Sequence, residues 1–288
     1  MLILLPKLSE GQDRAVEWYY ENQSSIIAER KIKSIKIKKT GIESLFTKVR
    51  CNGKLHLSKK FEFDRKGNLL ISSEYHESLD TLVKSIEYGY GRNGIYDQKI
   101  SRYFRKVDSI YTRQAWEFEF DSLGNRIIEN CGNMQNRLEY DSRNNLIQLT
   151  RQNCKECQSH RWLFQYDSVN QMIEILLQFV NDTIRNIKIE HFKYDQQGNL
   201  IQHVESNPSD TSERCLKKLY KYDKGLLVKE IITKTMWNVR NDESTPYHSD
   251  SYVEYIYDKD RMLIEKLWFW SDEDHPYRCH YYSYSFYE

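Results

Sequence analysis

An eight-residue pattern recurs along most of this chain and limits its fold more than any other feature. In the clearest copy, Tyr194 and Asp195 are followed by two variable residues, then Gly198 and Asn199, then two aliphatic residues. Seven copies align on their aspartates, which are Asp64, Asp121, Asp141, Asp167, Asp195, Asp223 and Asp258. Such repetition indicates one small structural unit used many times, so the repeat decides the predicted architecture.

The residues before each aspartate alternate as a half-buried strand does. The preceding residue is aromatic in every copy, and the residue two positions further back is again large and apolar. The residue between them is usually polar, as in Phe192-Lys193-Tyr194. This period of two predicts a strand with one buried face, to which aromatic side chains are suited.

Each aspartate is predicted to end its strand by opening a turn, because its side chain can accept a hydrogen bond from the backbone two residues on. Three residues after the aspartate, most copies have glycine or asparagine, which tolerate positive φ and close a common type of hairpin. The Asp223 copy is one residue shorter, and the Asp258 copy has Arg261 in place of glycine. The predicted structural turn residues are Asp64, Gly67, Asp121, Gly124, Asp141, Asn144, Asp167, Asn170, Asp195, Gly198, Asp223, Gly225 and Asp258.

The return strand begins with two adjacent large apolar residues in most copies, such as Leu200 and Ile201. Adjacent strand residues point to opposite faces, so the sheet should curl or be covered near its turns. The gap between Asp64 and Asp121 is about twice the usual spacing and predicts a degenerate copy at Tyr88–Ile95, with Gly91 in the aspartate position.

The string aromatic-Asp-x-x-Gly-Asn-aliphatic resembles the tyrosine-aspartate (YD) repeat of bacterial Rhs proteins and animal teneurins, over Phe61 to Ile264. The resemblance implies a sheet of hairpins that curls into a shell around another segment. This chain has far fewer copies than a closed shell needs. It also lacks the Asp-Pro self-cleavage segment that ends Rhs cores, since its only prolines are Pro6, Pro208, Pro246 and Pro276. The predicted fold is therefore all-β, an open or curled YD/Rhs-like array of antiparallel β-hairpin repeats with a short N-terminal helix.

The two ends are predicted to cap this array within one continuous domain. Residues 1–58 form the first cap, with a helix from Ser9 to Asn22 and an irregular hairpin; residues 59–267 hold the repeats; residues 268–288 form a closing strand and cap. The basic stretch Arg30–Lys39 is interpreted as an edge strand whose lysines block edge-to-edge pairing, with an anionic-ligand strip as the alternative. The alternating stretch Tyr281–Tyr287 is expected to pair and close the array.

Composition excludes some classes of partner. The 43 basic and 42 acidic residues leave a net charge of +1, so attraction to nucleic acid or to an anionic membrane is not expected. No apolar run approaches the roughly 20 residues of a membrane span. The six cysteines are scattered, which favours reduced thiols in the cytoplasm; a cell-surface or secreted location is the alternative if the N-terminus is truncated.

The search for chemistry gives no catalytic residue, no cofactor and no metal. Cys154 and Cys157 have zinc-knuckle spacing, but no second close pair completes the four ligands of a structural zinc site. Cys131, Cys215 and His191 could contribute only if the fold happened to place them nearby. The phosphate-loop, nucleophile-elbow and zinc-protease motifs are absent from the sequence.

The variable connections between repeats are the best candidates for binding, because loops on a regular scaffold usually carry function. These connections are Asn130–Asn136, Arg151–His160, Ser206–Arg214 and Asn238–Ser251. The sequence thus predicts a non-catalytic scaffold whose partner is another protein. A first alternative, an accessory or immunity protein of an Rhs-type toxin system, is implied by the resemblance alone. A second, carbohydrate binding, would use the aromatic residues Trp237, Tyr247, Trp268 and Trp270, which could equally form the core of the C-terminal cap.

Overall fold

The structure of the chain is a computed structural model, and the part of the chain that it describes is all β. The described residues are 31–40, 55–76, 81–90, 96–106, 109–153, 158–181, 183–208, 215–237, 246–271 and 276–286. They form eighteen strands and no helix, so they contain no helix with the length and hydropathy of a membrane span. The predicted helix at Ser9–Asn22 and most of the predicted first hairpin lie outside the described residues.

The chain divides into two compact units. Unit 1 is Phe118–Glu254, together with Met1–Pro6, and unit 2 is Lys7–Glu117 with Tyr255–Glu288. The strands of unit 1 are β7 (Arg126–Cys131), β8 (Met134–Tyr140), β9 (Leu146–Asn153), β10 (Gln158–Tyr166), β11 (Met172–Val180), β12 (Ile184–Tyr194), β13 (Leu200–Ser206), β14 (Cys215–Asp223), β15 (Leu226–Trp237) and most of β16 (Pro246–Tyr257). The strands of unit 2 are β1 (Ile32–Thr40), β2 (Leu55–Phe63), β3 (Leu69–Tyr75), β4 (Leu82–Tyr90), β5 (Tyr96–Lys106), most of β6 (Ser109–Phe120), β17 (Leu263–Trp270) and β18 (Arg278–Phe286).

Unit 1 is a continuous antiparallel meander. Consecutive strands from β7 to β16 pair with each other. The predicted loop at Asn130–Asn136 is a two-residue turn between β7 and β8, in which Gly132 has a φ of 58°. Because β8 to β15 are each paired on both sides, unit 1 is a sheet rather than a stack of separate hairpins.

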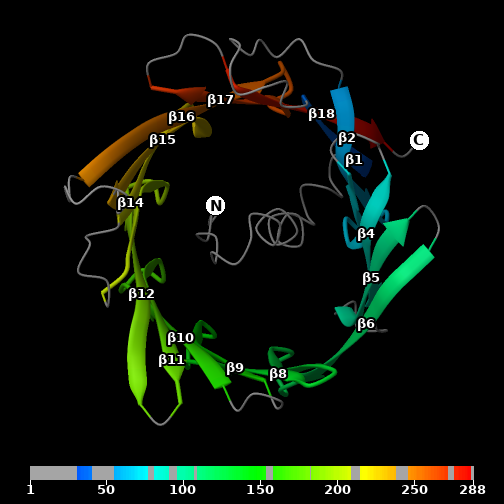
Figure 1. Cartoon of the computed structure of the whole chain (residues 1–288), viewed down its shortest axis with the longest axis vertical. Helices are drawn as coiled ribbons and strands as arrows, with labels where there is room; N and C mark the ends of the chain where they lie inside the picture. Colours follow the sequence, from blue (N-terminus) through cyan, green and yellow to red (C-terminus); the bar gives the residue numbers. More distant parts are fainter. Residues whose placement is uncertain are drawn as a thin grey trace. The chain divides into compact units, whose positions relative to one another are not determined.

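Unit 2 shows that the prediction of an open array with capped ends is wrong. β1, the first described strand, pairs with β2 on one side and with β18, the last strand, on the other (Figure 1). Ile35, for example, lies opposite Phe61 of β2 and Tyr284 of β18. The first and last described strands are therefore neighbours, and neither leaves an open end of the kind that the repeat pattern suggested. The expectation that the C-terminal stretch pairs is confirmed.

The interpretation of Arg30–Lys39 as an edge strand is also wrong. Ile32, Ile35 and Ile37 are buried in the core of unit 2, while Lys36 and Lys38 are exposed. β1 thus has one buried apolar face and one solvated lysine face. The lysines do not guard a free edge, because both edges of β1 are hydrogen-bonded.

The predicted aspartate turn is confirmed in six copies. In the Asp195 copy, the carboxylate Oδ1 accepts from the backbone N–H groups of Gln197 and Asn199 at 2.9 and 2.8 Å, and Oδ2 accepts from the Asn199 amide at 2.9 Å. Gly198 N–H donates to the Asp195 carbonyl at 3.1 Å, and its φ is 83°. The same backbone bonds occur at Asp64, Asp121, Asp141, Asp167 and Asp258.

The two irregular copies behave differently. Arg261 takes the glycine position of the Asp258 turn with a φ of 62°, so this turn forms without glycine. The Asp223 copy forms a two-residue turn in which Lys224 and Gly225 both have positive φ, between the paired residues Asp223 and Leu226. Positive φ at both central residues is the arrangement of a type I′ hairpin turn, so the missing residue changes the turn type.

Six tyrosines near the strand ends, four of which directly precede a repeat aspartate, link their strands to the preceding hairpin. Tyr194 donates its hydroxyl hydrogen to the carbonyl of Met172 at 2.9 Å, and Tyr166 donates in the same way to Leu146 at 2.9 Å. We call this series the tyrosine ladder; its other members are Tyr90 to Leu69, Tyr140 to Arg126, Tyr222 to Leu200 and Tyr284 to Leu263. Tyr90 belongs to the predicted degenerate copy, whose residues Gly91–Ile95 lie outside the described residues.

The core of each unit follows the predicted alternation. In unit 1 the buried cluster is Trp162, Phe164, Met172, Ile175, Phe192 and Leu200. In unit 2 it is Ile32, Ile35, Ile37, Phe61, Phe63, Leu69, Ile86 and Tyr88. The second aliphatic residue after each turn points to the other face, where Ile147, Ile173 and Ile201 are 36–37% exposed. The apolar pair after the turn therefore has one buried and one half-exposed member.

Candidate functional site

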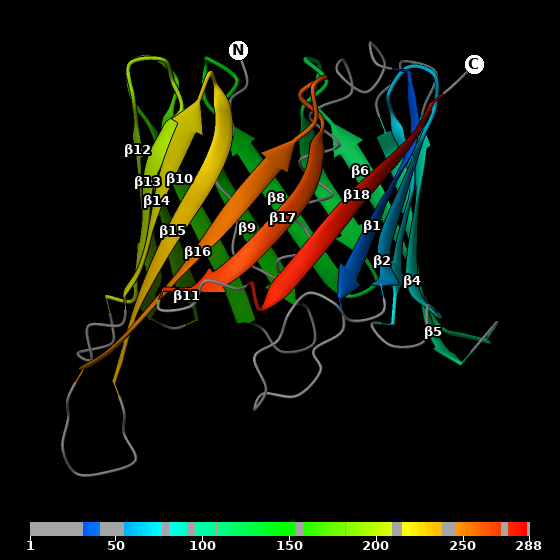
Figure 2. The ribbon, with the colours of Figure 1, turned by 90° about the horizontal axis from the view of Figure 1, so that it is seen from above.

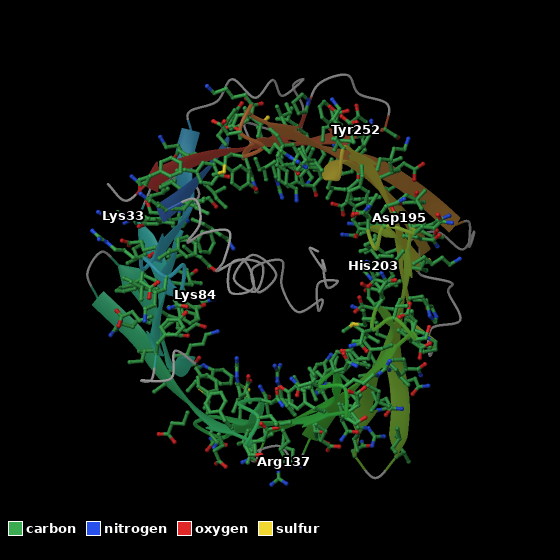
Figure 3. All side chains as sticks on the ribbon, turned by 180° about the vertical axis from the view of Figure 1, so that it is seen from behind. Lys33, Lys84, Arg137, Asp195, His203 and Tyr252 are labelled. Carbon is green, nitrogen blue, oxygen red and sulfur yellow. The ribbon has the colours of Figure 1, made fainter. Side chains whose placement is uncertain are left out.

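A cluster of charged side chains lies on the buried face of unit 1. On β12, alternation places Lys188, Glu190 and Phe192 on the same face. The antiparallel register then sets Glu190 opposite Glu205 and Phe192 opposite His203 on β13. Figure 3 shows His203 on the opposite face of the sheet from Arg137, an exposed residue of β8.

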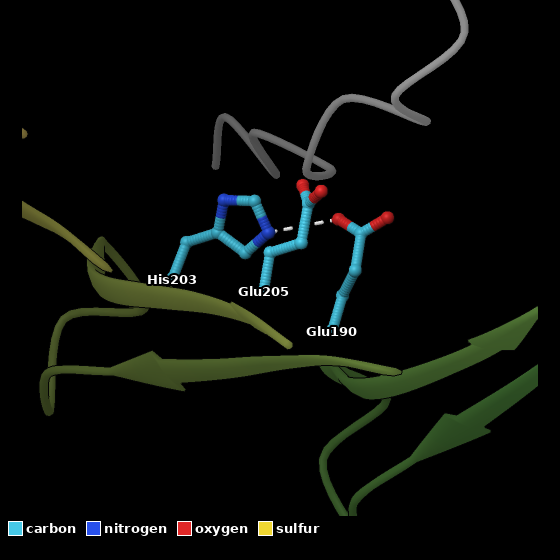
Figure 4. Close-up of side chains that lie close together, drawn as sticks. All are labelled: Glu190, His203 and Glu205. Carbon is cyan, nitrogen blue, oxygen red and sulfur yellow. Dashed lines mark hydrogen bonds and ion pairs between the residues drawn. The ribbon is translucent and has the colours of Figure 1, made fainter. Parts of the chain in front are cut away.

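Figure 4 shows Glu190, His203 and Glu205 of this cluster close together. His203 Nε2 and Glu190 Oε2 are 2.8 Å apart. The Lys188 ammonium lies 2.8 Å from Glu190 Oε1 and 3.0 Å from Glu205 Oε2, so it bridges the two carboxylates. The His203 ring stacks on Phe192, with 4.8 Å between ring centroids and 14° between planes. We call Lys188, Glu190, His203 and Glu205 the β12–β13 cluster.

The electrostatics of the cluster favour a charged Glu190. Burial opposes its charge, since Glu190 is only 3% exposed. The hydrogen bond with His203 and the adjacent Lys188 ammonium outweigh this penalty and hold the pKa of Glu190 below its usual value. Glu190 is therefore a carboxylate at neutral pH, in a place where a lone carboxylate would be costly.

A second ion pair lies on the next two strands. Lys218 on β14 contacts Glu230 on β15 at 2.8 Å, and Glu230 is buried. Burial and the negative charge of Glu230 raise the pKa of Tyr220, which lies opposite Glu230. This pair adjoins the β12–β13 cluster, because Lys218 is the register partner of His203.

The β12–β13 cluster has the donor atoms of a cation site. One ligand atom each from Glu190, His203 and Glu205 can be chosen so that all three lie within 4.8 Å of one another, and the described residues hold no other such group. Imidazole and carboxylate are ligands of zinc, whose catalytic sites use three protein ligands. Sequence reasoning did not identify this group of donor atoms. The signal in the sequence was a charged residue at a position that is apolar and buried in the preceding repeat. Glu190 occupies the position that Trp162 occupies in that repeat, and Lys188 lies two residues before it.

The aromatic residues predicted as binding candidates do not form one described surface. Trp270 is 41% exposed and stacks on Tyr277, with centroids 4.6 Å apart and planes at 16°. Trp268 is half-buried and packs against His280 and the Lys266 ammonium. Trp237 lies on β15 opposite Pro246, and Tyr247 lies on β16 opposite Met236. The side chains of Trp237 and Tyr247 are not among those that the structure describes.

The cysteines depart from the expectation of reduced thiols. Cys279 is buried and disulfide-bonded. Cys131 and Cys215 form no disulfide, and burial raises the pKa of the Cys215 thiol, which makes it less reactive. Cys154 and Cys157 lie outside the described residues. A disulfide at Cys279 argues for an oxidising compartment, where such bonds persist, rather than the cytoplasm.

Comparisons with known proteins give distant structural similarities. No family model matches the sequence, and no curated protein matches it. A solved TcdB2-TccC3-Cdc42 structure is similar at 10% identity and a TM-score of 0.35, covering 79% of this chain and 15% of that one. A porin-like protein from Bacteroides uniformis is similar at 10% identity and a TM-score of 0.47, covering 89% and 97%. One from Bacteroides vulgatus is similar at 12% and 0.39, covering 87% and 97%. At these values the similarities assign no function to this chain.

Proposed function

We propose that this chain is a non-catalytic repeat scaffold that binds another protein through the connections between its strands, with the β15–β16 hairpin as the main contact. The reach of this hairpin carries the proposal. β14 accompanies β15 only as far as Thr235, whereas β15 and β16 remain paired to Trp237 and Pro246. The hairpin therefore extends beyond β14 in unit 1, as Figure 2 shows at the lower left.

The residue types on this extension suit a protein interface. Met236 and Trp237 on β15 are the register partners of Tyr247 and Pro246 on β16. Aromatic residues and methionine are enriched at the centre of protein interfaces, where a few such side chains provide most of the binding energy. The regular turns and the tyrosine ladder provide the rigid support from which such an extension can bind.

The test removes the extension without disturbing the strands below it. In the full chain, residues 236–247 are replaced by Asn-Gly, which suits a two-residue turn and joins Thr235 to its register partner His248. A tagged wild-type chain is used to capture a partner from its native cell, and the identified partner is then purified and titrated against both proteins. The proposal expects binding to the wild type and its loss in the shortened chain. Equal binding to both refutes the β15–β16 hairpin as the contact.

A matched control separates loss of the contact from loss of the fold. The turn at Gly132-Asn133 is exchanged for Asn-Gly, because it also joins two strands of unit 1 but does not extend beyond its neighbours. This variant should bind the partner as the wild type does. Both variants should keep the far-ultraviolet circular dichroism of the wild type.

Carbohydrate binding is a second candidate, favoured by the exposure of Trp270. An exposed tryptophan can stack on the apolar face of a sugar ring, and Tyr277 fixes the orientation of Trp270 by covering one of its faces. Trp270→Ala should then abolish binding on a glycan array. Trp268→Ala, which removes a half-buried ring, is the control and should keep the binding as long as it keeps the fold. An array without a signal for the wild type refutes this candidate.

We also infer that the aspartate repeat is a short YD-type repeat, on the strength of its motif and of the turn that the motif forms. From that resemblance follows the narrower candidate, an accessory or immunity protein of an Rhs-type toxin system. Co-expression with a toxin encoded beside this chain's gene tests it, and survival that does not depend on this chain refutes it.

A further inference from the structure

We propose that the β12–β13 cluster is a zinc site whose cation position is filled by the Lys188 ammonium when no metal is bound. The ligands are Glu190, His203 and Glu205, and zinc exchanges with Lys188. This site lies on β12 and β13 and is independent of the proposed contact at the β15–β16 hairpin.

The geometry needs only small movements to accept zinc. Zinc bonds to nitrogen and oxygen of about 2.0–2.2 Å place tetrahedral ligand atoms about 3.4 Å apart. The three ligand atoms of the cluster already lie within 4.8 Å of one another, and His203 Nε2 is 2.8 Å from Glu190 Oε2. Two of the ligands come from buried positions on paired strands, so the backbone holds them in place.

Lys188 marks the position that favours a positive charge. Its ammonium bridges Glu190 and Glu205 at 2.8 and 3.0 Å, as a metal ion between the same carboxylates would. The lysine side chain is long and flexible, so the ammonium can move away while its stem stays packed. The Glu205 side chain is 29% exposed, which leaves a route for the ion and a fourth, water-filled position.

The exchange has a defined proton balance. Zinc binding at Nε2 of His203 requires that this nitrogen carry no hydrogen, so a hydrogen that it donates to Glu190 moves to Nδ1 of the same ring or to solvent. Lys188 leaves as an ammonium. Phe192, stacked on the ring, keeps the imidazole plane in the orientation that faces the two carboxylates.

The experiment measures zinc affinity of the full chain by competition with a chromophoric chelator, and cobalt is bound separately because its visible spectrum reports tetrahedral nitrogen and oxygen ligands. The wild type should bind one zinc ion per chain. His203→Gln and Glu190→Gln should each lower the affinity by at least about tenfold, because each removes one of three ligands. Lys188→Met should raise the affinity by at least about tenfold, because it removes a competing charge within a few ångströms of the ion.

The matched control is Lys229→Met, which removes an ammonium 3.3 Å from Glu254 on β15 and β16. Lys229 precedes the buried Glu230, so it lies on the other face of the sheet, and its removal should leave the zinc affinity unchanged. A purely structural role for the cluster predicts that Lys188→Met and Lys229→Met behave alike. If the wild-type chain binds no zinc, the proposal is refuted, even if Lys188→Met binds it. Zinc binding that is unchanged in both His203→Gln and Glu190→Gln also refutes it. Circular dichroism of every variant confirms that folding is retained.

Discussion

Removing one oxygen atom from the tyrosine ladder gives a direct measure of what holds successive hairpins together. In Tyr194→Phe the ring can keep its packing against the buried cluster of unit 1. The variant loses only the hydrogen bond from the hydroxyl to the Met172 carbonyl, which is 2.9 Å long. Phenylalanine already occupies this position in two natural copies, Phe63 and Phe120, so the backbone accepts it.

The expected loss of stability follows from the two groups involved. An intramolecular hydrogen bond contributes about 0.5–1.5 kcal/mol net, and a carbonyl left without its donor costs about 1–3 kcal/mol when water cannot reach it. Tyr194 is partly exposed, so water replaces part of what is lost. We expect Tyr194→Phe to lower the free energy of unfolding by about 1–2 kcal/mol.

The assay is urea unfolding followed by both circular dichroism and tryptophan fluorescence, since agreement between probes is needed for a single free energy. The control is Tyr281→Phe, which removes a hydroxyl that makes no hydrogen bond within the described part of the chain. Tyr166→Phe should resemble Tyr194→Phe. If both ladder variants lose no more than the control, the ladder does not stabilise the sheet and the reasoning fails.

Three further predictions concern the turns and the ladder. Asp195→Ala should lower the urea midpoint. Hydrogen bonds from Asn199 hold the pKa of Asp195 below its usual value, so their contribution to stability is full above that usual value and is lost as pH falls through the folded pKa. The variant should therefore differ least from the wild type in acid. Gly198→Ala should lower the free energy of unfolding by about 1–2 kcal/mol, because φ is 83° and a Cβ would lie 3.1 Å from the Gln171 amide. Gly198→Asn should lower it less, and equal urea midpoints for the two variants would contradict this. Burial raises the pKa of Tyr166 to about 12 from 10.0, so its neutral form stabilises the fold fully below pH 10 and this stability is lost as pH rises through 12; ultraviolet titration should show Tyr166→Phe removing a late-titrating phenol.

The turns and strands could be predicted because their causes are local. An aspartate that bonds the backbone two and four residues on, and a residue with positive φ after it, act within a few positions of each other. Even the Asp258 turn follows this rule, since the aspartate bonds persist and force Arg261 into the glycine conformation. The Asp223 turn differed because a deletion of one residue selects another turn type.

The pairing of β1 with β18 could not be predicted, because its partners are separated by most of the chain. Alternation showed that Ile35 and Tyr284 each belong to a strand face, but it says nothing about which strand lies beside which. The lysines of β1 are equally compatible with an edge and with a solvated face, and only the pairing on both sides of β1 decides between them.

The β12–β13 cluster depends on register as well as on alternation. The sequence shows charged residues at Lys188, Glu190 and Glu205, but exposed strand positions of this chain, such as Lys193 and Lys221, are charged as well. Only the bulge beside Tyr194, which offsets the pairing by one residue, places Glu205 opposite Glu190 and His203 opposite Phe192. A shift of one residue would place these side chains on the other face.

The hydrogen bonds of the tyrosine ladder all run in the same direction along the chain. Each phenol donates to a backbone carbonyl of the hairpin made before it, and every hairpin has such a carbonyl whatever its side chains. The earlier hairpin therefore supplies the acceptor independently of its own side chains. We expect that duplication or deletion of a whole repeat changes the length of the sheet without changing the hydrogen bond at junctions that carry tyrosine; the Phe63 and Phe120 copies lack the hydroxyl.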